Sequence, residues 1–167
     1  LLIYQTFANC LDLTTITGNG NWRFHTTVNV DLSSMFQNCF VLDGLNTTNW
    51  NTEKVTTLSQ TFRECRALTE LDLSNWNLSN CTSMYIWIYG CDELTTLGDV
   101  SNLDTSNIAQ MGYVFSEVDK LTVDVSNWDV SSVTDLSYFT NGSGGSGSIT
   151  GYENWDTASL AGTLING

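Results

Sequence analysis

Apolar residues recur along the chain with a spacing of about 26 residues, which is typical of a repeat architecture. One set of positions is aromatic or Ile, and Cys or Val follows each of them three residues later. Because three sets keep one period over the whole chain, we expect them to stack into a shared core. The sets are Phe7, Phe36, Phe62, Ile88 and Phe115; Trp22, Trp50, Trp76, Leu103, Trp128 and Trp155; and Val28, Val55, Cys81, Ile108, Val133 and Leu160.

The pattern within one repeat predicts a short strand, a turn and a short helix. Leu71 and Leu73 alternate with polar residues, as expected for a strand with one buried face, and Val123 and Val125 repeat this alternation. The tryptophan that follows is expected to fold inward as an apolar plug. The helix is predicted from an i, i+3, i+4, i+7 spacing of apolar residues over residues 32–39, 84–91 and 111–118.

These elements predict a repeat solenoid that forms a single domain over residues 1–167. It would hold about six units, with one parallel β-sheet and short helices or turns on the opposite side. Residues 142–148 read GSGGSGS, so we expect a natural, flexible Gly/Ser-rich loop that interrupts the last repeat. The chain opens at Leu1 inside a repeat, and we expect it to be a piece of a longer protein.

The charge of the chain excludes some classes of partner. Five Lys and Arg face eighteen Asp and Glu, which gives a formal net charge of −13. A nucleic-acid partner would need a basic surface, and anionic lipid headgroups would be repelled. No run of about twenty apolar residues is present, so we expect no membrane insertion.

Four of the five cysteines share one position of the repeat, and Val118 occupies that position in a further copy. A position that accepts Val is a small buried apolar site, so we expect the cysteines to be structural and reduced. Parallel side-chain directions disfavour a disulfide between neighbouring units. His25 is the single histidine and cannot complete a metal-ligand set, so no metal and no cofactor are expected.

Acidic residues provide the candidate binding site. Glu70, Asp72, Asp99 and Asp124 are expected on the outward face of the strands, where a stacked repeat offers an extended surface. The alternative is a solvated face without a ligand. Asp104, Asp129 and Asp156 follow the tryptophan positions and could hold Ca²⁺ through oxygen ligands, or only bond to turn backbone. No catalytic set can be assembled, so we do not expect an enzyme.

The repeat resembles a known family. Residues 62–73 show the pattern F-x-x-C-x-x-L-x-x-L-x-L, which resembles the BspA-type leucine-rich repeat. Residues 126–136 (SNWDVSSVTDL) are similar to the 26-residue bacterial surface protein repeat, also described from mycoplasma lipoproteins. The resemblance implies a right-handed leucine-rich-repeat solenoid and an extracellular or cell-surface role in adhesion and recognition, with copies also found in viral particles. It carries no catalytic residues.

The sequence therefore predicts a non-enzymatic recognition, adhesion or structural module of an extracellular surface protein. One alternative is a virion decoration or fibre protein at the virion surface. Another is ice or mineral-surface binding by threonines, although pairs such as Thr56–Thr57 and Thr95–Thr96 would point to opposite faces of a strand. The expected partners are a glycan, a surface protein, or neighbouring subunits that cover the end units.

Overall fold

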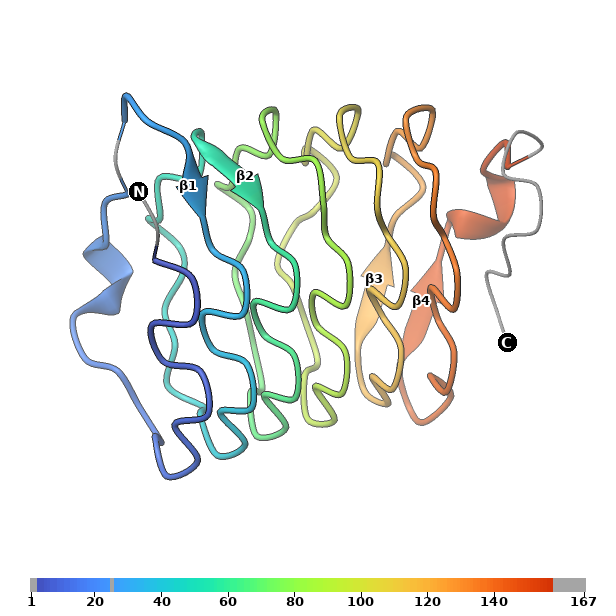
Figure 1. Ribbon diagram of the computed structural model, residues 1–167. Helices are drawn as coiled ribbons and strands as arrows, with labels where there is room; N and C mark the ends of the chain where they lie inside the picture. The colour runs from blue at the N-terminus through green and yellow to red at the C-terminus, as the bar shows by residue number, and fades with distance from the viewer. Residues whose placement is uncertain (1–2, 25, 158–167) are drawn as a thin grey trace.

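The computed structural model describes residues 3–24 and 26–157, so His25 and Leu160 lie outside the described residues. Figure 1 shows successive segments of the chain lying side by side. Within the described part, no helix is long and apolar enough to cross a membrane. The regular elements are short, namely the 3₁₀ helices η1 (Asn19–Asn21) and η2 (Tyr152–Asn154) and the strands β1 (Val30–Asp31), β2 (Val55–Thr57), β3 (Thr122–Asp124) and β4 (Ser148–Thr150).

The strands form two separate parallel pairs, β1 with β2 and β3 with β4. Val30 pairs with Val55 and Val123 with Ile149. Between these pairs the described chain has isolated parallel bridges, such as Glu70 with Thr96, where one continuous sheet was expected. The predicted strand around Leu71 is therefore not part of a continuous sheet. The Leu71 N–H donates to the Thr96 carbonyl at 3.1 Å.

The segments predicted as helices fold instead as two consecutive β-turns, which we call the double turn. In residues 32–39, the Met35 N–H donates to the Leu32 carbonyl and the Cys39 N–H to the Phe36 carbonyl, each at 3.1 Å. The helix prediction is wrong because Ser34, with φ of 55°, breaks the helical path, and the second turn repeats this conformation. Double turns occupy residues 3–10, 32–39, 58–65, 84–91, 111–118 and 136–143.

Each double turn bonds to the next one along the chain. The N–H groups of Phe36, Phe62 and Phe115 donate to carbonyl groups in the following double turn at 2.9–3.0 Å. These bonds use the backbone groups that an α-helix would have bonded within itself. The partners lie about one repeat period apart, so they align equivalent residues of neighbouring units.

The core consists of the repeated apolar positions. Phe62 is 0% exposed and Trp76 and Trp128 are 4% and 3% exposed, which confirms the placement of these three residues in the core, whereas Trp22 is only partly buried. Phe7 and Trp155, in the first and last described units, are only partly buried against it. In the third set, Val28 is exposed and Val30 is buried, so Val30 and not Val28 belongs to that set.

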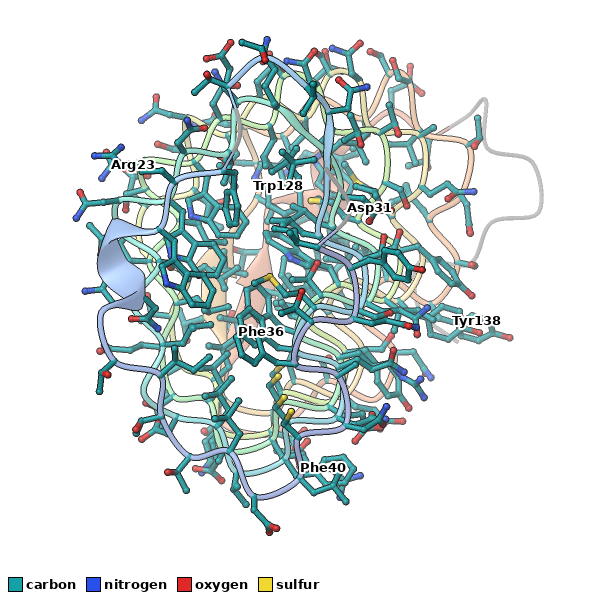
Figure 2. The ribbon with its side chains drawn as sticks, turned by 60° about the vertical axis from the view of Figure 1, so that its left-hand side comes forward. Arg23, Asp31, Phe36, Phe40, Trp128 and Tyr138 are labelled. Atoms are coloured by element: carbon teal, nitrogen blue, oxygen red, sulfur yellow. The ribbon has the colours of Figure 1, made fainter. Side chains whose placement is uncertain are left out.

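Buried polar atoms bond from one unit to the preceding one. The indole N–H groups of Trp50 and Trp76 donate to the carbonyls of Asn19 and Thr47 at 2.8 and 3.3 Å. Rings of neighbouring units also stack on one another, and the ring centroids of Phe36 and Phe62 lie 5.7 Å apart. Figure 2 shows Phe36 and Trp128 inside the molecule and Arg23 and Tyr138 at its outside.

The cysteine position is buried at Cys39, Cys65 and Cys91, as predicted, and half-buried at Cys10, and it also supplies a hydrogen-bond donor. The Cys65 and Cys91 thiols donate to the carbonyls of Phe36 and Phe62, each at 3.2 Å. In the last double turn, Ser143 donates to the Phe115 carbonyl in the same way. Burial raises the pKa of the Cys65 thiol well above its ordinary value, so this thiol stays protonated and can donate.

The end of the Gly/Ser-rich segment bonds to the preceding unit, whereas a Cβ at Gly144 would have open space around it. The Gly147 N–H donates to the Asp119 carbonyl at 2.8 Å, and Ser148 begins β4. A Cβ at Gly147 would lie 2.3 Å from the Leu121 carbonyl oxygen. Glycine is therefore required here by the close approach of two backbones.

Candidate recognition surfaces

The four predicted acidic residues line two neighbouring hollows on the outer surface. Glu70 and Asp72 line the first hollow, and Asp99 and Asp124 line the second. Gly98 belongs to both linings, so the hollows adjoin. The structure thus brings the predicted residues together as two pairs.

These carboxylates also hold the turns that follow them. Oδ1 of Asp72, Asp99 and Asp124 accepts the N–H of the residue two positions later, at 2.9–3.0 Å. Hydrogen bonds from Ser74 lower the pKa of Asp72, because they favour its charged form. Part of the acidic surface is therefore explained by the folding of the turns.

The residues considered for Ca²⁺ are bonded in the same way. Oδ1 of Asp104 and of Asp129 accepts the N–H of the serine two positions later, at 3.1 and 2.8 Å. Asp129 and Asp156 line a common hollow beside Trp128 and Trp155. Among the described residues, no group of three or more His, Cys, Asp or Glu side chains could hold a metal ion.

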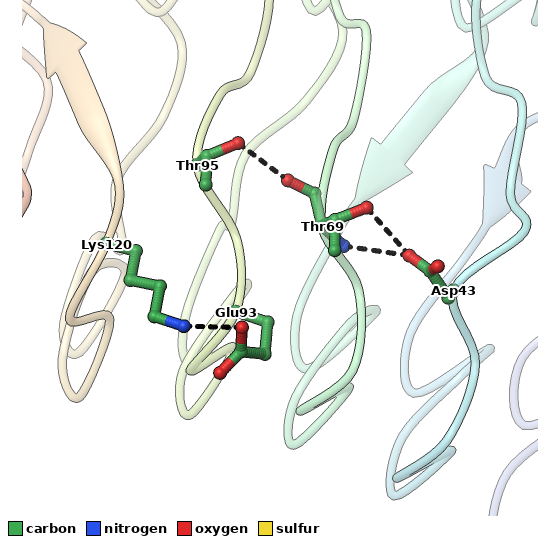
Figure 3. A network of polar contacts seen from close by, with 5 residues as sticks. All are labelled: Asp43, Thr69, Glu93, Thr95 and Lys120. Carbon is green, nitrogen blue, oxygen red and sulfur yellow. Dashed lines mark hydrogen bonds and ion pairs between the residues drawn. The ribbon is translucent and has the colours of Figure 1, made fainter.

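Threonine side chains connect neighbouring units on the exposed surface. Figure 3 shows Thr95 Oγ1 donating to the Thr69 carbonyl at 2.9 Å and Thr69 Oγ1 donating to Asp43 at 2.7 Å. Lys120 and Glu93 form an ion pair at 2.5 Å beside them. An exposed pair of this kind contributes about 0–1 kcal/mol. The hydroxyls of Thr69 and Thr95 bond to the protein itself, which weakens the case for a free threonine array.

A cluster of tyrosines was not predicted from the sequence. Tyr85, Tyr89, Tyr113 and Tyr138, which we call the tyrosine patch, are all half-buried on the double turns. Tyr113 is central, since its ring stacks on Tyr138 at 4.9 Å and meets Tyr85 and Tyr89 edge-on at 6.1 and 6.5 Å. The spacing between Tyr113 and Tyr138, close to one repeat period, was the available signal.

Two of these tyrosines occupy an unfavourable backbone conformation. Tyr113 and Tyr138 have φ of 58° and 53°, in the left-handed region that bulky side chains rarely adopt. Such a conformation costs on the order of 1 kcal/mol or more per residue. The equivalent positions of earlier double turns carry Gln5, Ser34 and Gln60, so the turn itself does not require an aromatic residue.

Charged groups surround the tyrosine patch. The Arg63 guanidinium lies over the Tyr89 ring, 6.0 Å from its centroid. Burial and a hydrogen bond to Glu117 raise the pKa of Tyr89, so its hydroxyl remains a donor. Glu64 forms an ion pair with Arg66 at 2.7 Å. The patch therefore combines aromatic rings with carboxylates, and one cation already lies against it.

Comparison with known families places the chain in a repeat family. A model described as Mycoplasma protein of unknown function, DUF285, matches residues 3–96 and again residues 82–162. The second match begins about three 26-residue periods after the first, as a repeat predicts. No curated protein and no solved structure matches the chain.

Proposed function

The chain belongs to the DUF285 family of Mycoplasma proteins of unknown function, and we propose that it is a non-enzymatic recognition or adhesion module of an extracellular surface protein. The observation that carries this proposal is the tyrosine patch, a half-exposed aromatic surface that the folding of the double turn does not explain. Aromatic residues are enriched where proteins bind partners.

We further propose that the parallel contacts between units represent a leucine-rich-repeat-like solenoid of the BspA type. Backbone donors of one double turn reach the next, and equivalent rings such as Phe36 and Phe62 stack. A stack of this kind would hold its outer side chains at fixed spacings, which suits recognition of an extended partner. The carboxylates of Asp72, Asp99 and Asp124 hold their own turns, which favours a structural or binding role over a catalytic one.

Location at a surface is tested by labelling intact cells of the source organism with an antibody against the chain. We expect labelling before lysis and loss of the signal after protease treatment of intact cells. A signal that appears only after lysis would overturn the proposal. The same antibody applied to purified particles tests the virion alternative, and a thermal-hysteresis measurement tests ice binding.

A further inference from the structure

We propose that the tyrosine patch is a docking surface for a partner protein, which it binds through an exposed Arg- or Lys-rich segment of that partner. This inference rests on the proposed function and gives its partner a chemical class. Four rings from three successive double turns meet at this surface, with Tyr113 at the centre of every contact.

Folding does not account for the rings. Tyr113 and Tyr138 have positive φ, and Ile86, also with positive φ of 57°, occupies the same turn position in the unit before Tyr113. Gln5 and Gln60 fill this position in earlier units. In three successive units this position therefore carries a large side chain, Ile86, Tyr113 or Tyr138, and each of them stays half-exposed.

The tyrosine rings themselves supply the exposed surface. On these double turns or directly before them, Ser83, Gly112 and Ser116 are buried and Ser137 is half-buried. A tyrosine ring suits contact with a protein because it gives a large contact area at low entropic cost.

The negative charge near the tyrosine rings favours binding of a cationic segment of the partner. Asp135 lies beside the patch, since a Cβ on Gly112, the neighbour of Tyr113, would be 2.9 Å from its Oδ2, and Glu117 lies on the same double turn as Tyr113. The Arg63 guanidinium over the Tyr89 ring shows that this surface accepts a guanidinium group. The net charge of −13 would speed the approach of a cationic partner and repel a second copy of this chain.

Charge favours a cationic segment over a neutral glycan. Tyr113 and Tyr138 stack with an interplanar angle of 23°, so the face that each ring turns toward the other is closed to any partner. The tyrosine hydroxyls can accept hydrogen bonds from Arg or Lys, and the neighbouring carboxylates attract a cation but not a neutral sugar.

The experiment selects a displayed library of random 12-residue peptides against the 167-residue chain and measures the affinity of the enriched peptides. We expect Arg- or Lys-rich sequences whose affinity falls about tenfold or more in Tyr113→Asn. Asn suits the left-handed conformation at this position, which offsets part of the ring contacts that are lost, so the variant should fold, and its melting temperature checks this. Tyr85→Ser, at a position with ordinary φ, is a second test, and Gln5→Asn is the matched control outside the patch.

Four results would overturn the inference. They are the absence of enriched peptides, enrichment of neutral or acidic peptides, cationic peptides that bind Tyr113→Asn and Tyr85→Ser like the parent, and a glycan on an array whose binding depends on Tyr113. None of these results changes the outcome of labelling on intact cells, so failure of this inference is distinguishable from failure of the proposed function.

Discussion

Truncation of Phe62 to Ala tests the packing of the core. Phe62 is 0% exposed and its ring lies 5.7 Å from that of Phe36, with an interplanar angle of 2°. An aromatic side chain buries roughly 150–250 Å², which corresponds to about 4–6 kcal/mol at ~25 cal/mol per Å². The remaining methyl group recovers part of this, so we expect Phe62→Ala to lower the free energy of unfolding by about 3–5 kcal/mol.

The assay is urea denaturation followed by tryptophan fluorescence, with linear extrapolation to water. Phe40→Ala is the matched control, because Phe40 is half-exposed and the Arg66 guanidinium lies 5.1 Å from its ring centroid. Its loss should cost only about 1 kcal/mol. A loss below about 1 kcal/mol for Phe62→Ala, or equal losses in both variants, would refute the placement of Phe62 in the core.

Three further predictions concern the cysteine position, the Gly/Ser-rich segment and the acidic turns. Cys65→Val should unfold within about 1 kcal/mol of the parent, because only a weak thiol hydrogen bond is lost, and reducing agent should not change the melting temperature of the parent; a large loss with reducing agent would reveal a disulfide. Gly147→Ala should lower the free energy of unfolding by about 1–3 kcal/mol through its backbone contact, whereas Gly144→Ala, with open space around its Cβ, should be neutral or stabilising by up to ~1 kcal/mol; equal urea midpoints would place the segment outside the stack. Hydrogen bonds from Ser131 lower the pKa of Asp129 below its ordinary 3.8, so the stabilisation is present above that value and is lost as the pH falls through the folded-state pKa. Asp129→Asn keeps the acceptor oxygen, so its melting temperature should fall less than that of the parent between pH 5 and 3. Equal decreases in melting temperature for both proteins would argue against this role.

The core could be predicted from the sequence because apolar residues recur at each of its positions about every 26 residues. Phe62, Trp76 and Trp128 are buried as expected. The helices could not be predicted correctly, since a double turn places apolar residues such as Leu32, Met35, Phe36 and Cys39 at the same i, i+3, i+4, i+7 spacing as a helix face. Only the positive φ values, which leave no trace in apolar periodicity, distinguish the two.

The sequence could predict positions of the candidate site but not its contacts. The outward carboxylates could be located from strand alternation, but their hydrogen bonds to turn N–H groups depend on local geometry. The tyrosine patch was missed because Tyr85 and Tyr89 come from different positions of the double turn and meet Tyr113 only across units. The close backbone approach that requires glycine at Gly147 could not be predicted from composition, because it depends on contact with another unit.

The most direct test of the account is amide hydrogen exchange, resolved by residue with NMR. The account requires the N–H groups of Phe36, Phe62 and Phe115 to bond to the following unit, while the exposed Ser101 N–H bonds only to Asp99 within its own turn. We therefore predict that the first three amides exchange at least about a hundredfold more slowly than that of Ser101, because they open only with the core. Exchange of the Phe62 amide as fast as that of Ser101 would contradict the parallel stacking of units on which the proposed surfaces depend.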